Sequence, residues 1–264
     1  MSLPTNKNNI IKKDIWSSFK EHTDARIALG RTGNSLPTHE LLKFGMSHAL
    51  AKDAIYRELD INKIQQLLLE NHFESFIVNS KAINKKEYLM NPNLGRQLSE
   101  NSMTFLKEKN IEKGNITIIF GDGLSATAIN INACPLLFEL NQALQNTKFK
   151  LNPIIIAQQA RVALSDEIGE ALQSQASIIF IGERPGLSSP DSLGIYLTWN
   201  PKKGKKESER NCISNVRNQG LSYKEAAFKT AWLLIEAEKI NSSGILLKDE
   251  SIFIEDSGIV TLER

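Results

Sequence analysis

The sequence contains no histidine beyond His72, although the chain continues to residue 264. Histidine is the usual general base of hydrolases and a common metal ligand. A Ser…Asp…His triad therefore cannot form around Ser125, and Gly123-Leu124-Ser125-Ala126-Thr127 also lacks the second glycine of a nucleophile elbow. Cys212 has no histidine in its half of the chain that would activate its thiol. These absences argue against an independent hydrolase.

Signatures for metals and nucleotides are missing as well. His39, His48 and His72 match no compact set of metal ligands, and no cysteine lies near them in the sequence. We therefore expect no metal site. Gly121-Asp122-Gly123 lacks the third glycine of a dinucleotide fingerprint, and the absence of a Walker A sequence argues against a nucleoside triphosphate.

Net charge, cysteine and long apolar runs are also scarce. A net charge of +2 argues against a nucleic-acid partner, and the lysines of residues 202–206 precede Glu207 and Glu209, as in a solvated loop. Two cysteines form no disulfide framework, which favours a reducing compartment. No apolar run approaches the ~20 residues that cross a bilayer, and the polar N-terminus lacks a signal-peptide pattern. We expect a cytoplasmic protein without a membrane partner.

The second half of the chain carries apolar, β-branched runs that predict strands. These runs lie at residues 116–120, 153–157, 178–181 and 194–199. Helical patterns lie between the first three, one with a break at Cys134-Pro135 and one capped by Ser165. Ser222 and Glu225 form a capping box for a later helix. The alternation predicts an α/β fold with a Rossmann-like, doubly wound parallel sheet.

The first half is mostly helical by its pattern. Helices are expected at residues 38–59, 63–69 and 91–107, and a strand at 73–78. In residues 10–22, Ile11, Ile15 and Phe19 recur every four residues, which predicts an amphipathic helix that docks on the chain's own core or on another protein. We expect a tail with this helix (1–23), a mostly helical domain (24–114) and an α/β domain (115–264), with an added strand at 251–255.

The strand at residues 177–181 ends in Gly182-Glu183-Arg184-Pro185-Gly186. This sequence places a carboxylate and a guanidinium at the carboxyl end of a buried strand, which is the edge where open α/β sheets bind ligands. The turn after the first strand, residues 121–125, should lie on the same edge. An ordinary loop with a surface Glu–Arg pair fits the same residues. Reasoning from the residues thus gives a binding cleft and no reaction.

Four stretches in this order resemble the small (light) subunit of ethanolamine ammonia-lyase. They are Ala25-Arg26-Ile27-Ala28-Leu29-Gly30-Arg31-Thr32-Gly33, Gly121-Asp122-Gly123-Leu124-Ser125, Gly182-Glu183-Arg184-Pro185-Gly186-Leu187 and Asn211-Cys212-Ile213-Ser214-Asn215. Arg161-Val162 and the stretch 166–170 are also similar to the family, and the resemblance spans residues 24–241.

The resemblance implies an adenosylcobalamin-dependent enzyme that deaminates ethanolamine to acetaldehyde and ammonia. A large subunit with a TIM-type barrel would hold the substrate, and this chain would have no catalytic residue. By resemblance, its cobalamin contacts are Val162, Glu183 and Cys212. Arg184 either pairs with a ligand oxygen or orients Glu183, and we favour the second role. The chain has no Asp-x-His-x-x-Gly sequence, so no histidine is expected on cobalt.

Resemblance to the family also suggests a cytoplasmic enzyme that can reside in a bacterial microcompartment. The alternative is a stand-alone α/β module that binds a nucleotide or cofactor and regulates without catalysis.

Overall fold

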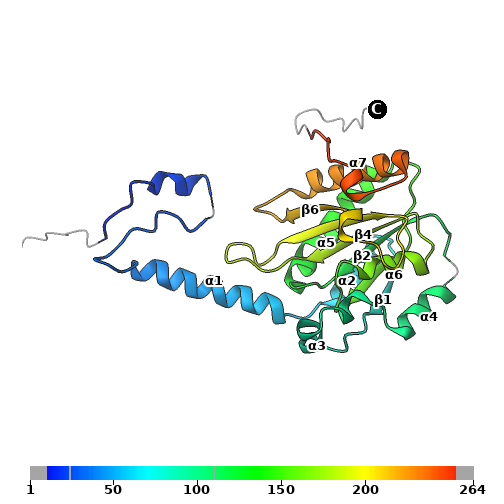
Figure 1. Cartoon of the computed structure of the whole chain (residues 1–264), viewed down its shortest axis with the longest axis horizontal. Helices are drawn as coiled ribbons and strands as arrows, with labels where there is room; N and C mark the ends of the chain where they lie inside the picture. Colours follow the sequence, from blue (N-terminus) through cyan, green and yellow to red (C-terminus); the bar gives the residue numbers. More distant parts are fainter. Residues whose placement is uncertain (1–10, 24, 110, 254–264) are drawn as a thin grey trace, which may run out of the picture.

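The computed structural model describes residues 11–23, 25–109 and 111–253. One six-stranded sheet has helices on both faces, and an arm with a long helix projects from it (Figure 1). The strands are β1 (Ser75–Asn79), β2 (Ile116–Gly121), β3 (Ile154–Gln158), β4 (Ala176–Gly182), β5 (Leu193–Trp199) and β6 (Arg210–Val216). The helices are α1 (Thr38–Tyr56), α2 (Ile61–Glu70), α3 (Lys85–Met90), α4 (Glu100–Glu108), α5 (Ala126–Leu144), α6 (Leu164–Ala171) and α7 (Tyr223–Ile240), and the short 3-10 helices are η1 (Ser17–Glu21), η2 (Leu94–Arg96), η3 (Glu207–Glu209) and η4 (Gly244–Leu246).

The sheet is mixed, with the strand order β1-β3-β2-β4-β5-β6. The α/β class is confirmed, but the sheet is not parallel throughout. β1, β3, β2 and β4 pair parallel, whereas β5 pairs antiparallel with both β4 and β6. The loop of residues 183–192 contains no helix, and a parallel connection needs a longer crossover. The chain therefore turns back after β4. β1 and α2 precede residue 114 and yet lie in the layers of this sheet.

The two faces of the sheet are covered unequally. On one face, α5 and α7 pack on a large apolar core that includes Phe120, Phe180 and Leu197. On the other face, α4 and α6 cover the parallel strands through a smaller core that includes Ile179 and Leu164. α7 is the helix that contacts both β5 and β6. The opposite side of these two strands is open, and Cys212 and Ser214 are exposed there.

Several helix boundaries differ from the sequence predictions. α5 continues through Pro135 instead of breaking there, because burial along most of its length offsets the lost hydrogen bond. The helix expected at 91–107 is instead η2 followed by α4, which begins where the Ser99 side chain accepts from the Ser102 N–H. α6 begins at Leu164 without a side-chain cap, so Ser165 is not the cap. Ser222 caps α7, as predicted.

The N-terminal arm contains less helix than expected. Residues 11–22 hold only η1, and Ile15, Trp16 and Phe19 are exposed, so the prediction of an amphipathic helix over this stretch is wrong. Residues 251–253 form no strand, and the rest of the strand expected at 251–255 lies outside the described residues. No helix in the described part of the chain is long and apolar enough to span a membrane.

Candidate functional site

The loops that follow β2, β3 and β4 meet at one edge of the sheet. The Leu124 N–H donates to the Gly182 carbonyl over 3.0 Å, and the Ala160 N–H donates to Asp122 Oδ1 over 2.8 Å. Gly123 has a φ of +55°, and a Cβ there would lie 2.3 Å from the Gly182 oxygen. The close approach therefore requires glycine, and the predicted shared edge of the first and third turns is confirmed.

Glu183 leaves β4 at this edge and is held by three donors. The Ser192 hydroxyl donates to its carboxylate over 2.5 Å, the Ser214 hydroxyl donates to Oε1, and the Asn215 N–H donates over 3.4 Å. Ser214 and Asn215 belong to β6, so the carboxylate reaches across β5. These three neutral donors fix the orientation of the carboxylate, and no cation forms an ion pair with it in the described part of the chain.

Gly194 on β5 leaves the room that this carboxylate needs. A Cβ at residue 194 would come within 2.9 Å of Glu183 Oε1. Arg184, in contrast, is exposed and makes no hydrogen bond or ion pair with the described residues. The prediction that Arg184 orients Glu183 is therefore wrong, and the serines do so instead.

Tyr196 and Cys212 form the floor beside Glu183. They are partners in the β5–β6 ladder, so both side chains project from the open face. Burial raises the pKa of Tyr196, with further rises from Cys212 and Glu183. Cys212 is exposed as a residue, but desolvation of its thiol raises the pKa, which leaves a neutral, poorly nucleophilic group. This surface suits packing rather than covalent catalysis.

Val162 lies in the turn between β3 and α6. Its carbonyl accepts from the Ser165 N–H and hydroxyl, and its side chain is partly buried on the same apolar core as Tyr196. The structure thus brings Glu183 and Cys212 together around Tyr196, while Val162 packs on the shared core. Sequence reasoning missed Tyr196, Ser192 and Ser214. Strand alternation places Ser214 on the face of Cys212, but the pairing with Tyr196 depends on tertiary register.

A buried ion pair fixes β6 to α6 below this surface. Arg210 at the start of β6 lies 2.6 Å from Asp166 in α6, and their side chains are 1% and 2% exposed. Burial raises the pKa of Asp166 to about 7, while Arg210 opposes this rise. The pair therefore sets the position of the strand that carries Cys212 and Ser214.

Fold and site together define an α/β protein in which Glu183, Tyr196 and Cys212 form a polar and apolar cradle at an edge of the sheet. Within the described ranges, no group of three histidine, cysteine or acidic residues is placed to hold a metal ion. The chain belongs to the ethanolamine ammonia-lyase light chain (EutC) family, whose model matches residues 13–248.

Curated relatives agree with this assignment. The ethanolamine ammonia-lyase small subunit of Xanthomonas campestris pv. campestris (strain B100) is 42% identical over 254 residues, which cover 95% of this chain and 92% of that protein. The small subunit of Pseudomonas fluorescens (strain Pf0-1) is 44% identical over 239 residues, covering 89% and 87%. That of Pseudomonas aeruginosa (strain LESB58) is also 44% identical over 239 residues, covering 89% and 88%.

Proposed function

We propose that this chain is the small subunit of an adenosylcobalamin-dependent ethanolamine ammonia-lyase, which converts ethanolamine to acetaldehyde and ammonia. In this proposal it binds the corrinoid at the interface with a large subunit, which holds the substrate. The observation that carries the proposal is the cradle formed by Glu183, Tyr196 and Cys212 on the open face of β5 and β6. The reaction is inferred from family membership, and the cofactor-binding role of this chain is inferred from the cradle.

The residues of the cradle fit a corrinoid. A corrin has peripheral amides, which donate hydrogen bonds, around a flat and largely apolar ring. Glu183 accepts three donors and has capacity for a further one. Val162, Tyr196 and Cys212 offer apolar atoms to the ring, and Gly194 keeps the carboxylate accessible. When bound, adenosylcobalamin supplies a carbon radical by homolysis of its cobalt–carbon bond. Glu183 would fix the cofactor's orientation, and the apolar floor would exclude water from its edge.

The exposed helix α1 supports a partner chain. Leu41, Leu42, Met46 and Leu50 are 46–68% exposed and lie on more than one side of this helix. Several large apolar side chains exposed together on one helix are typical of a surface that other protein covers. We assign this cover to the large subunit, because the relatives are named small subunits. Figure 1 shows α1 projecting from the sheet, where a second chain has access to it.

The cellular location of the enzyme is part of the same proposal. We propose a cytoplasmic enzyme, with Ile15 and Phe19 on the arm as an apolar contact for a microcompartment protein. Both side chains are exposed, at 87% and 49%.

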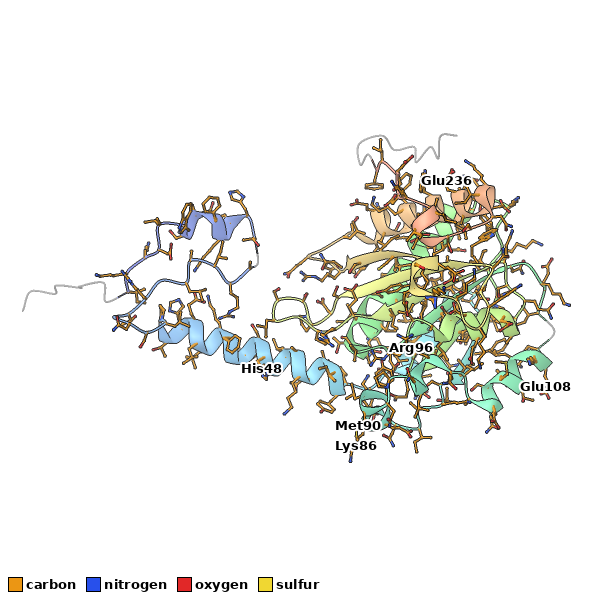
Figure 2. All side chains as sticks on the ribbon, viewed as in Figure 1. His48, Lys86, Met90, Arg96, Glu108 and Glu236 are labelled. Atoms are coloured by element: carbon orange, nitrogen blue, oxygen red, sulfur yellow. The ribbon has the colours of Figure 1, made fainter. Side chains whose placement is uncertain are left out.

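The test uses the complex of this chain with the large subunit. Glu183→Lys should weaken cobalamin binding to the complex by about tenfold or more, because it replaces an acceptor with a donor. The matched control is Glu108→Lys, since Glu108 is an exposed acid on α4, a helix that contributes no residue to the cradle, and Figure 2 shows Glu108 at the periphery of the molecule. Unchanged cofactor affinity in Glu183→Lys would place the site elsewhere. If the isolated chain binds a nucleotide or cofactor and does not bind the large subunit, the alternative function of a stand-alone regulatory module is favoured.

A further inference from the structure

A second polar cluster lies at the carboxyl edge, between β2 and β3. The chain leaves β2 for α5 on one face of the sheet and leaves β3 for α6 on the other. Neighbouring parallel strands whose connections diverge in this way create the crevice where open α/β sheets bind ligands. Lys85 and Tyr88 of α3 lie over this crevice, with Asp122 and Arg161 from the two loops. None of these four residues belongs to the cradle around Glu183.

Tyr88 is a fixed platform for two cations. Its ring is fully buried, and its hydroxyl donates to the Ala160 carbonyl over 3.1 Å. The Lys85 ammonium lies 4.9 Å from the ring centroid and the Arg161 guanidinium carbon lies 4.7 Å from it. Lys85 also donates to the Gly123 carbonyl over 2.8 Å. An ammonium has three donors, so further ones remain for a ligand.

The cations of the crevice are not neutralised by the residues around them. No described carboxylate oxygen lies within 4.0 Å of the Lys85 or Arg161 nitrogens. The nearby acid is Asp122, which is 5% exposed and accepts from the backbone of Ala160. Burial raises the pKa of Asp122 and lowers that of Lys85, although each opposes the shift of the other. A bound anion would restore the balance of charge.

Two buried polar atoms in the loop that follows β3 have no partner among the described residues. They are Nε of Arg161 and Oε1 of Gln159, both without a hydrogen bond within the described chain. Gln159 also has a φ of +55°, an uncommon value for a residue other than glycine. Unpaired buried groups and unusual backbone gather at ligand sites. The donor suits an anionic oxygen, and the amide oxygen suits a hydroxyl group beside it.

We propose that Lys85 and Arg161 form a phosphate-binding site at the β2–β3 crevice. The inference rests on the proposed function for its ligand, which is the phosphodiester in the nucleotide tail of the corrinoid, with the adjoining ribose hydroxyl near Gln159. Arg161 directly precedes Val162, so a cofactor packed on Val162 brings this part of its structure within reach. A free phosphate ion presents the same oxygens and is the second source of this chemistry.

The experiment compares two corrinoids on the two-subunit complex. Cobalamin carries the nucleotide tail, whereas cobinamide lacks its phosphodiester-linked ribose and base. Dissociation constants are measured by equilibrium dialysis for the wild type, Arg161→Gln, Lys85→Gln and Lys86→Gln. Lys86 is the matched control, because it is an exposed lysine beside Lys85 on α3 that Figure 2 shows away from the core. Circular dichroism and thermal unfolding check that each variant is folded, and Lys85→Gln keeps the test valid if Arg161→Gln does not fold.

We expect Arg161→Gln and Lys85→Gln to weaken cobalamin binding by about 10- to 100-fold, the usual loss for a hydrogen bond to a charged group. Cobinamide binding should change less than about twofold. In a second experiment, inorganic phosphate is titrated into the corrinoid-free complex, and its binding is followed by phosphorus NMR. If phosphate binding is lost in both variants while the two corrinoids respond equally, the source is free phosphate.

Equal responses of the two corrinoids, together with no effect on phosphate binding, would overturn the phosphate site. The proposed function is tested by a different outcome of the same experiment. A wild-type complex that binds neither cobalamin nor cobinamide would refute the proposed function, and the phosphate titration would still decide the site.

Discussion

The hydroxyl of Ser214 in β6 donates a hydrogen bond to the carboxylate of Glu183, which follows β4. The two residues come from strands that are not neighbours, because β5 lies between them. The position of Glu183 therefore depends on the antiparallel extension of the sheet.

Removing the Ser214 hydroxyl should loosen the Glu183 carboxylate. We expect Ser214→Ala to weaken cobalamin binding to the two-subunit complex by about threefold to tenfold, since one hydrogen bond contributes roughly 0.5–1.5 kcal/mol. The stability of the fold should change little, because Ser214 is exposed. Equilibrium dialysis with cobalamin measures the effect. Ser188→Ala, at an exposed serine in the loop after β4, is the control and should leave affinity unchanged.

Strands β2, β3 and β4 follow from the sequence, since buried β-branched runs such as 177–181 have few alternatives to a central strand. The sequence did not predict β6, because polar residues on its open face leave only a short and irregular apolar pattern. The pairing of Tyr196 with Cys212 and the approach of Lys85 to Arg161 were also missed. Both join residues far apart in the sequence, and such contacts depend on register and on loop packing.

Two glycines in helices should respond oppositely to alanine. At Gly169 in α6, a Cβ would lie 2.4 Å from Pro201 Cγ, whereas at Gly45 in α1 no atom lies within 4 Å. We expect Gly169→Ala to lower the free energy of unfolding by about 1–3 kcal/mol through overpacking. Gly45→Ala should raise it by up to about 1 kcal/mol, because alanine favours helix. Chemical denaturation of the isolated chain measures both. Equal effects would mean that α6 does not pack closely on Pro201.

The buried pair of Asp166 and Arg210 predicts a pH dependence. Burial raises the pKa of Asp166 to about 7 in the folded chain, against about 3.9 in an unfolded one. The folded state then binds more protons than the unfolded state between these values, so the contribution of Asp166 to stability falls as pH rises from about 4 to 7. Asp166→Asn removes this titration.

Thermal unfolding at a series of pH values tests this sign. The difference in melting temperature, wild type minus Asp166→Asn, should decrease as pH rises from 4 to 7.5. An increase over this range would mean that Arg210 outweighs burial and keeps Asp166 ionised in the folded chain.

The apolar surface of α1 predicts how the chain assembles. Leu42 and Met46 are 68% and 62% exposed, so an aspartate at either position removes little that supports the isolated fold. If the large subunit covers this helix, each aspartate becomes a desolvated, unpaired charge in the interface, which costs several kcal/mol. We therefore expect Leu42→Asp and Met46→Asp to abolish co-purification with the large subunit while the melting temperature of the isolated chain stays within a few degrees of the wild type. Ile245→Asp is the matched control, because Ile245 is 75% exposed and lies outside α1, in η4. It should leave assembly intact, and loss of assembly in the control alone would move the interface away from α1.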